Sequence, residues 1–297
     1  EALCQPLVAI IFGLVVGAVV ILACGQNPMA VYAELFEKSF IKPYYLFSTL
    51  TRATPIIICA MATGMSWRAG YINLGVEGQM VTGTLVATVV ALFLPGPPLL
   101  VAVIAWIAGM AAGALYALLP SVLVWKFNVS MVITTLMLNY IANYLLLYLI
   151  NGPMQDPYSD LSQTDLVPEG MRLARLFAPY RLHTGFFLLL AVVIVMIFFW
   201  RTTLGYRIDL VGQGEKVATY SGVNVKRTVV ITMCISGAFS GLAGFIETFG
   251  INYRLLDGIA GDAGNIATIV ALLGSLNVYG IIAAAMFFSV LLCGGAS

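Results

Sequence analysis

Arg68-Ala-Gly-Tyr-Ile-Asn-Leu-Gly-Val-Glu-Gly-Gln79 is a polar segment set between long apolar runs. Asn73, Glu77 and Gln79 are costly to place in hydrocarbon, and the three glycines of the segment permit an irregular backbone. A membrane protein tolerates such a break only where protein or a water-filled path covers it. The segment therefore predicts a broken membrane helix whose polar side chains serve either a substrate path or a structural hinge.

The composition excludes a soluble fold. Of the 297 residues, 61% are apolar and 9% are charged, whereas an ordinary soluble domain has about 25% charged residues. Mean hydropathy is +0.99. The net charge of +1 offers no basic field for nucleic acid, and the five cysteines form no CxxC pair, so neither a metal site nor a disulfide framework is expected. A polytopic membrane protein remains.

A helix needs about 20 apolar residues to cross the bilayer. The stretch Gly264 to Cys293 is interrupted at 274–277 and predicts a re-entrant half-helix followed by a span. We expect an all-α protein with about 8–9 transmembrane or re-entrant helices, several of them broken, forming one transmembrane domain over 1–297. The other candidate spans are Leu7–Cys24, Tyr44–Trp67, Val76–Leu94, Leu99–Trp125, Met131–Ile150, Thr184–Trp200 and Val229–Glu247.

The distribution of cations predicts the orientation. Loop 201–227 carries five cations against two acidic residues and should be cytoplasmic. Loop 151–183 mixes both signs and should be extracytoplasmic, which places the N-terminus in the cytoplasm. Three Trp–cation pairs, at 67–68, 125–126 and 200–201, fall at the predicted cytoplasmic ends of spans, where such residues are enriched.

Within loop 201–227, the segment Val211 to Gly222 predicts a two-turn helix. Gly214 marks its start, Glu215 suits the positive end of the helix dipole, and Gly222 fits a C-terminal stop. Val217 and Tyr220 give it a partly apolar surface. The segment either docks another protein in the cytoplasm or is a solvated connector.

Other polar residues within spans have both functional and structural explanations. Asn139 and Asn143 lie one helical turn apart and either face a polar path or form hydrogen bonds between helices. Glu247 ends a span, where capping or snorkelling is favoured over proton relay. His183 is expected at the membrane interface before a span.

Small residues predict close helix packing at two places. The pairs Gly109/Gly113 and Gly237/Gly241 have the spacing that lets two helix backbones approach closely.

Missing motifs limit the energy source. The sequence has no G-x-x-x-x-G-K-[ST] loop, so this chain does not itself hold ATP by a P-loop. It also lacks H-E-x-x-H and G-x-S-x-G, so it is not expected to be an enzyme. An ion-coupled secondary transporter would need an intramembrane ion site, for which Glu77 is the only good candidate.

Several ordered blocks resemble one family. Asn73-Leu-Gly-Val-Glu-Gly-Gln-Met80 resembles the NIGVEGQM motif of ABC-importer permeases of the ribose/branched-chain amino-acid type. Val132–Ala142, followed by Asn151-Gly-Pro153 and Asp156-Pro157, is similar to the nucleoside branch. Gly212–Val225 resembles the cytoplasmic coupling segment of the family, and Ile235–Gly244 and Ile269–Gly274 match later blocks.

The chain departs from the family pattern at three places. Met131 stands where the family usually has Glu, and Gly214-Glu215 replaces an Asn-Pro pair in the coupling segment. The last span of the family is absent, so we expect the C-terminal span to be missing from this chain.

The resemblance implies the permease subunit of an ATP-driven importer for nucleosides, with a simple sugar such as ribose as the alternative substrate, in the cell membrane of a prokaryote. The implied partners are membrane lipid, a second and related permease, an extracytoplasmic substrate-binding lipoprotein, and a cytoplasmic ATPase whose two nucleotide-binding domains are commonly fused. ATP and Mg would be bound by that ATPase, with no cofactor in this chain. The implied coupling residues are Gly212, Gly214, Glu215, Lys216, Val217, Tyr220 and Gly222.

Overall fold

The computed structural model describes residues 4–41, 43–177, 179–261 and 263–294, which are helical apart from loops and two isolated bridges. No strand occurs within these ranges. The elements are α1 (Cys4–Ala23), α2 (Pro28–Ile41), α3 (Pro43–Arg68), α4 (Val76–Phe93), α5 (Pro98–Phe127), α6 (Met131–Ile150), η1 (Glu169–Met171), α7 (Gly185–Phe199), α8 (Thr203–Gln213), α9 (Glu215–Tyr220), α10 (Val225–Ile246), the π-helical η2 (Glu247–Asn252), α11 (Ala263–Leu273) and α12 (Val278–Gly294).

The apolar helices confirm an all-α polytopic membrane protein. Five helices are long and apolar enough to cross a membrane: α3, α4, α5, α6, and α10 continued by η2. Two bent pairs raise that number to seven if each is one span: α1 with α2 is bent by 116°, and α7 with α8 by 70°. The shorter apolar helices α11 and α12 are separated at the predicted interruption, where Ser275 and Leu276 adopt left-handed backbone angles.

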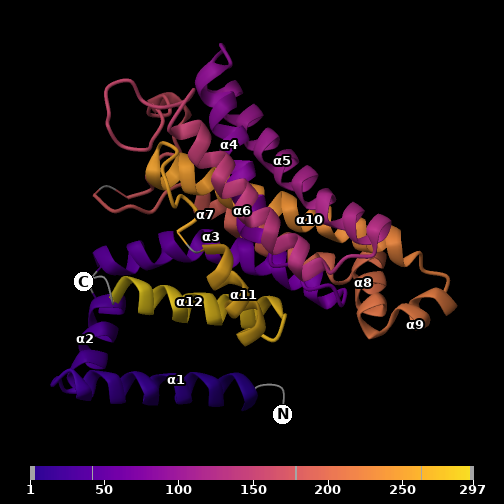
Figure 1. Cartoon of the computed structure of the whole chain (residues 1–297). Coiled ribbons are helices and arrows are strands. Elements are labelled where there is room, and N and C mark those ends of the chain that lie inside the picture. Colours follow the sequence, from indigo (N-terminus) through magenta and orange to yellow (C-terminus); the bar gives the residue numbers. More distant parts are fainter. Residues whose placement is uncertain (1–3, 42, 178, 262, 295–297) are drawn as a thin grey trace.

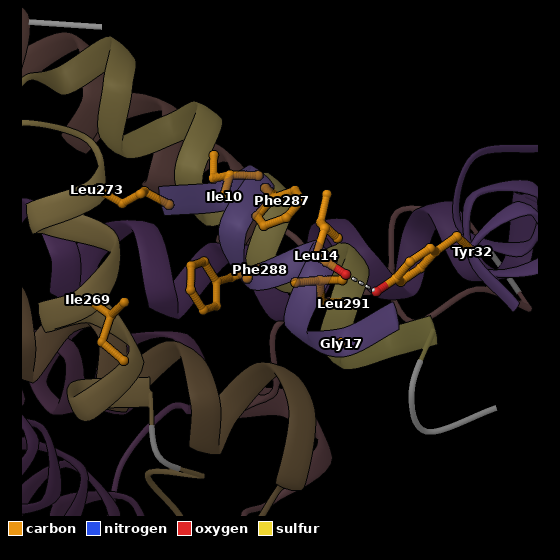
Figure 2. Close-up of a pocket in the computed structure, with 10 residues that line it drawn as sticks. Ile10, Leu14, Gly17, Tyr32, Ile269, Leu273, Phe287, Phe288 and Leu291 are labelled. Atoms are coloured by element: carbon orange, nitrogen blue, oxygen red, sulfur yellow. Dashed lines mark hydrogen bonds between the residues drawn. The ribbon is translucent and has the colours of Figure 1, made fainter. Parts of the chain in front are cut away.

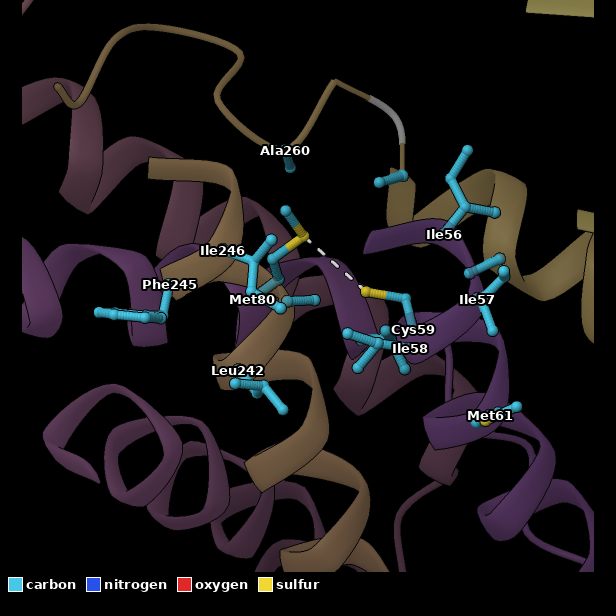
Figure 3. Close-up of a cluster of buried hydrophobic side chains, with 14 of the residues drawn as sticks. Ile56, Ile57, Ile58, Cys59, Met61, Met80, Leu242, Phe245, Ile246 and Ala260 are labelled. Atoms are coloured by element: carbon cyan, nitrogen blue, oxygen red, sulfur yellow. Dashed lines mark hydrogen bonds between the residues drawn. The ribbon is translucent and has the colours of Figure 1, made fainter. Parts of the chain in front are cut away.

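Helix α3 is the centre of the bundle. Every residue from Ala53 to Ser66 is buried. Figure 3 shows side chains of α3, α4 and α10 meeting in this core, where the Cys59 thiol lies 3.9 Å from the sulfur of Met80. The polar segment that follows α3 starts at the partly exposed Arg68 and becomes buried at Asn73.

Helix α1 lies beside the bundle and is joined to it through α2 (Figure 1). The sequence did not predict α2. Figure 2 shows the cavity of about 420 Å³ that α1 and α2 form with α11 and α12. Its lining is apolar, and the Tyr32 hydroxyl at its edge donates to the carbonyl of Leu14 at 2.7 Å. Such a lining suits lipid tails better than a polar substrate.

Glycines bring α5 and α10 into close contact, as their spacing predicted. A methyl group on Gly113 would fall on the carbonyl oxygen of Gly237, and one on Gly241 would fall on the carbonyl oxygen of Gly109. Gly83 of α4 joins the same contact. This glycine seam holds three helices at backbone distance.

The segment 151–183 folds back onto the end of α10. The Leu173 amide donates to the carbonyl of Phe249 at 2.9 Å, and the Thr164 amide donates to that of Leu255 at 3.0 Å. His183 is fully buried beneath this segment, and its Nδ1 accepts from the Gly185 amide at 3.1 Å. His183 lies just before α7, as expected of a residue before a span, and protein covers its ring. Burial lowers the pKa of His183 to about 4, so the ring is neutral at physiological pH.

The glycine seam should tolerate no side chain. We expect Gly113→Ala to lower stability by about 1–3 kcal/mol, because its methyl group must displace the α10 backbone. The thermal unfolding midpoint in detergent measures this loss. Gly13→Ala is the matched control, since nothing lies within 4 Å of a methyl group at that position of α1. Equal midpoints for the two variants would contradict the seam.

Candidate functional site

The backbone between α3 and α4 is held by the side chain of Asn139 on α6. Its amide nitrogen donates to the carbonyl of Leu74 at 2.7 Å, and its amide oxygen accepts from the Gly78 amide at 2.8 Å. Asn139 is 7% exposed. One buried side chain thus provides partners for the Leu74 carbonyl, just before α4, and for the Gly78 amide in its first turn. Backbone groups at a helix start otherwise lack partners within the helix.

Asn73 completes the broken turn from within. Its side-chain oxygen accepts from the Gly75 amide at 2.8 Å, and its carbonyl accepts from the Trp67 indole at 3.2 Å. Thr135 of α6 accepts from the Leu74 amide at 3.2 Å. Asn73 is fully buried, and its amide nitrogen has no hydrogen-bond partner within the described ranges.

Glu77 lies in the first turn of α4, where its carboxylate accepts from the Asn143 side chain at 3.3 Å. The Gly75 and Gly78 amides at this helix start donate to the side-chain oxygens of Asn73 and Asn139. Both asparagines of α6 bond across to the α3–α4 region, which agrees with the interhelical alternative.

The structure brings the four predicted residues of the helix break together. Gln79 is buried and its amide nitrogen lies 3.5 Å from the side-chain oxygen of Asn73. The Ser240 hydroxyl of α10 lies 3.4 Å from the Gln79 amide oxygen. Asn73, Gln79 and Asn139 therefore bond within or across the break, and Glu77 lies in the same first turn of α4 with Asn143 as its partner. The part of this break in a substrate path stays a prediction.

The predicted coupling segment contains two helices rather than one. Helix α8 ends at Gln213, and Gly214 takes a φ of 148° before α9 begins at Glu215. Gly212 therefore belongs to α8, where a methyl group would fall on the carbonyl oxygen of Arg68. The predicted helix start at Gly214 is confirmed, and residues 211–213 of the segment belong to α8 instead.

Helix α9 ends in a Schellman motif. The Val223 amide donates to the carbonyl of Ala218 at 2.9 Å, and the Gly222 amide donates to that of Thr219 at 3.0 Å. Gly222 has a φ of 75°, which favours glycine. The helix stop therefore lies where the sequence placed it.

The surface of α9 is open. Tyr220 is 92% exposed and Val217 is 47% exposed, whereas Ala218 is buried and anchors the helix. Glu215 and Lys216 are also exposed. Large apolar side chains on a six-residue helix are thus presented outward at the end of the bundle opposite to segment 151–183 (Figure 1).

Two polar contacts join the α8–α9 unit to the helix break. Arg68 forms a bidentate ion pair with Asp209 of α8, at 2.8 and 3.0 Å, and stacks on the Trp200 ring at 3.8 Å. The Tyr71 hydroxyl donates to the Glu215 carboxylate of α9 at 2.6 Å. Burial and this hydrogen bond raise the pKa of Tyr71. The sequence analysis missed Tyr71 and Asp209, since nothing local identifies their partners.

The described helices break inside the bundle, several polar side chains pair between helices, and the short helix α9 is exposed at one end. A family model described as "Branched-chain amino acid transport system / permease component" matches residues 45–295. The chain belongs to this family of ABC transporter permeases.

Curated relatives agree along most of the chain. It is 34% identical to the guanosine ABC transporter permease protein NupP of Bacillus subtilis, over 94% of this chain and 82% of the relative. It is 33% identical to the nucleoside ABC transporter permease protein NupB of Lactococcus lactis, over 97% and 82%. A glucose ABC transporter permease protein of Haloferax volcanii is 30% identical, over 98% and 80%. No solved structure matches.

The family fixes the class of activity. The chain is a multi-pass membrane permease, a transport subunit that catalyses no reaction itself, and ATP is hydrolysed by a partner ATPase. A second permease and a substrate-binding protein belong to such assemblies. The family assignment favours an ATP-driven importer over the ion-coupled secondary transporter considered from the sequence.

The Asn139 contact can be tested by removing its amide. Asn139→Leu should leave the Leu74 carbonyl and the Gly78 amide unpaired, at about 1–3 kcal/mol each. We expect a lower thermal unfolding midpoint in detergent. The control Asn151→Leu, at the exposed end of α6, should change the midpoint far less. A midpoint for Asn139→Leu equal to that of the control would show that the amide does not hold the break.

Proposed function

We propose that this chain is the permease subunit of an ATP-driven importer of nucleosides. The observation that carries the proposal is the similarity to permeases whose names specify guanosine and nucleosides, at 33–34% identity over nearly the whole chain. A simple sugar such as ribose is the second candidate, supported by the glucose permease of Haloferax volcanii. Guanosine and glucose share several hydroxyl groups on a sugar ring.

We propose that α9 docks the cytoplasmic ATPase, which would bind ATP and Mg in its own nucleotide sites. The exposed Tyr220 and Val217 would be the apolar anchors, and the Schellman stop at Gly222 would fix their direction. A helix of this length is marginal alone in water, so its packing through Ala218 and its contact with the partner must stabilise it.

Movement of α9 would reach the substrate path through its polar contacts. Glu215 is bonded to Tyr71, and Tyr71 lies in the broken backbone two residues before Asn73. Asp209 is bonded to Arg68 at the end of α3. Closure of the ATPase would thus pull directly on the break, where the unpaired amide nitrogen of Asn73 could gain a partner in a second state.

The second permease would pack on α6. Tyr140, Tyr144 and Tyr148 recur every four residues on one exposed face, at 58%, 68% and 70% exposure. Tyrosine is enriched where a polar tip meets a partner or a wet boundary, and Tyr140 lies midway along the helix. Bacillus subtilis has a second guanosine permease, NupQ, 28% identical over 81% of this chain, which supports a related but non-identical subunit.

The substrate-binding lipoprotein would approach the opposite end of the bundle, at segment 151–183. The bacterial relatives support the plasma membrane of a prokaryote. Loop 201–227 would then face the cytoplasm, as would the N-terminus.

The docking role of α9 can be tested at Tyr220. Tyr220→Ala should weaken binding of the ATPase by more than about thirtyfold, because an aromatic anchor at an interface is often worth over 2 kcal/mol. Pull-down of the ATPase and ATP-driven uptake in proteoliposomes measure this loss. Tyr158→Ala removes a tyrosine that is 97% exposed at the opposite end and should change neither. Normal coupling in Tyr220→Ala would make α9 an ordinary connector.

The orientation can be tested with single cysteines and an impermeant thiol reagent in intact cells. We expect a cysteine at Lys216 to be protected and one at Asp160 to be labelled, because the cations of loop 201–227 retain it in the cytoplasm. Permeabilised cells should label both. Labelling of Lys216→Cys in sealed cells would reverse the topology.

A further inference from the structure

A polar cavity of about 340 Å³ lies at the end of α3 that is opposite to Arg68. It combines residues from α3, η2, the end of α12 and the loop before α7. Ile251 and Cys293 complete its wall. Its polar lining consists of Ser48, Thr51, Arg52, Arg181, Glu247 and Asn252.

Hydrogen bonds hold three of the polar side chains of this cavity. The Asn252 side-chain amide donates to the Glu247 carboxylate at 3.1 Å, and the Arg52 guanidinium donates to the carbonyl of Leu292 at 3.3 Å. Both Glu247 and Asn252 lie on a π-helix, a rare form that is frequently found at functional sites. An ionisable residue within a membrane span suggests a function by default. Glu247 takes no part in the contacts that join α8 and α9 to the helix break, so its own role is still to be assigned.

We propose that this cavity binds the sugar hydroxyl groups of the substrate. A carboxylate with two oxygens can accept hydrogen bonds from neighbouring hydroxyl groups of a ribose ring. Asn252 would both donate and accept, and Arg52 and Arg181 would donate to hydroxyl or carbonyl oxygens. Small-molecule sites have volumes of about 300–1,000 Å³, so the cavity suits one sugar or nucleoside rather than a peptide.

The location of the cavity gives it a place in transport, and this step rests on the proposed function. It opens at the end of the bundle predicted to face outward, under the segment 151–183 that carries Arg181. A nucleoside released by the binding protein would meet these groups before it reaches the helix break. Glu247 and Asn252 are therefore the residues of this chain that would first form hydrogen bonds with the sugar hydroxyl groups.

Cys293 in the cavity wall provides a native probe. In the full transporter complex in nanodiscs, a methanethiosulfonate reagent would label Cys293, located by peptide mass spectrometry. We expect a ribonucleoside to protect Cys293, and its 2′,3′-dideoxy analogue to need at least about tenfold more for equal protection, since the hydroxyl bonds are lost. Cys24, which is exposed in the α1–α2 turn and not part of the cavity lining, should label equally throughout.

Glu247→Gln tests the carboxylate. We expect the ribonucleoside to protect about tenfold less well, with the preference over the dideoxy analogue reduced, and unliganded Cys293 to label at the normal rate if the cavity is intact. If that unliganded rate changes, the comparison is repeated with Glu247→Asp, which retains the carboxylate and should retain the ribose preference. Asp160→Asn makes the same carboxylate-to-amide change on the exposed outer segment and should leave protection unchanged.

The outcomes separate this inference from the proposed function. Nucleoside uptake without any protection of Cys293 would overturn the cavity and leave the importer standing. Protection by ribose or glucose without nucleoside uptake would support the cavity and overturn the nucleoside assignment. Better protection by leucine would indicate an amino-acid site, and better protection by a nucleoside 5′-monophosphate would indicate a phosphate site. Either result overturns the proposal.

Discussion

The side chain of Asn139 carries the constraint on which the rest of the bundle depends. In a membrane interior each unpaired backbone group is expensive, so a helix can break only where a partner is supplied. Asn139 supplies two partners at once, a donor for Leu74 and an acceptor for Gly78. The chain can therefore turn from the buried α3 into α4, and the polar side chains of Asn73 and Gln79 can remain inside the protein.

The glycine seam and the helix break have complementary mechanical roles. At the seam, Gly109 and Gly241 let α5 and α10 pack at backbone distance, so these helices move together. At the break, hydrogen bonds between side chains and backbone replace a continuous helix. Tyr71–Glu215 and Arg68–Asp209 connect this softer region to α8 and α9. Under the proposed coupling role of α9, a movement of this helix would therefore reach the break more readily than the seam.

The sequence predicted features that depend on local composition. Hydropathy placed α6 at Met131–Ile150, glycine spacing predicted the seam, and Gly214 and Gly222 indicated where α9 begins and ends. It failed where a feature depends on distant residues. Tyr71 and Glu215 are 144 positions apart, and the burial of His183 depends on segment 151–183 folding onto η2. Local patterns of hydropathy or glycine spacing carry no information about contacts between residues so far apart in the sequence.

The same reasoning explains why the polar cavity escaped notice. Glu247 alone is more often a capping residue at a span end, and its meaning changes only when Arg52 and Asn252 are placed beside it. Helix α3 connects the polar cavity with the α8 contact: Arg52 lies in the cavity near one end, and Arg68 contacts α8 at the other. Because Ala53 to Ser66 are buried between them, a shift of α3 along its axis would change both regions together.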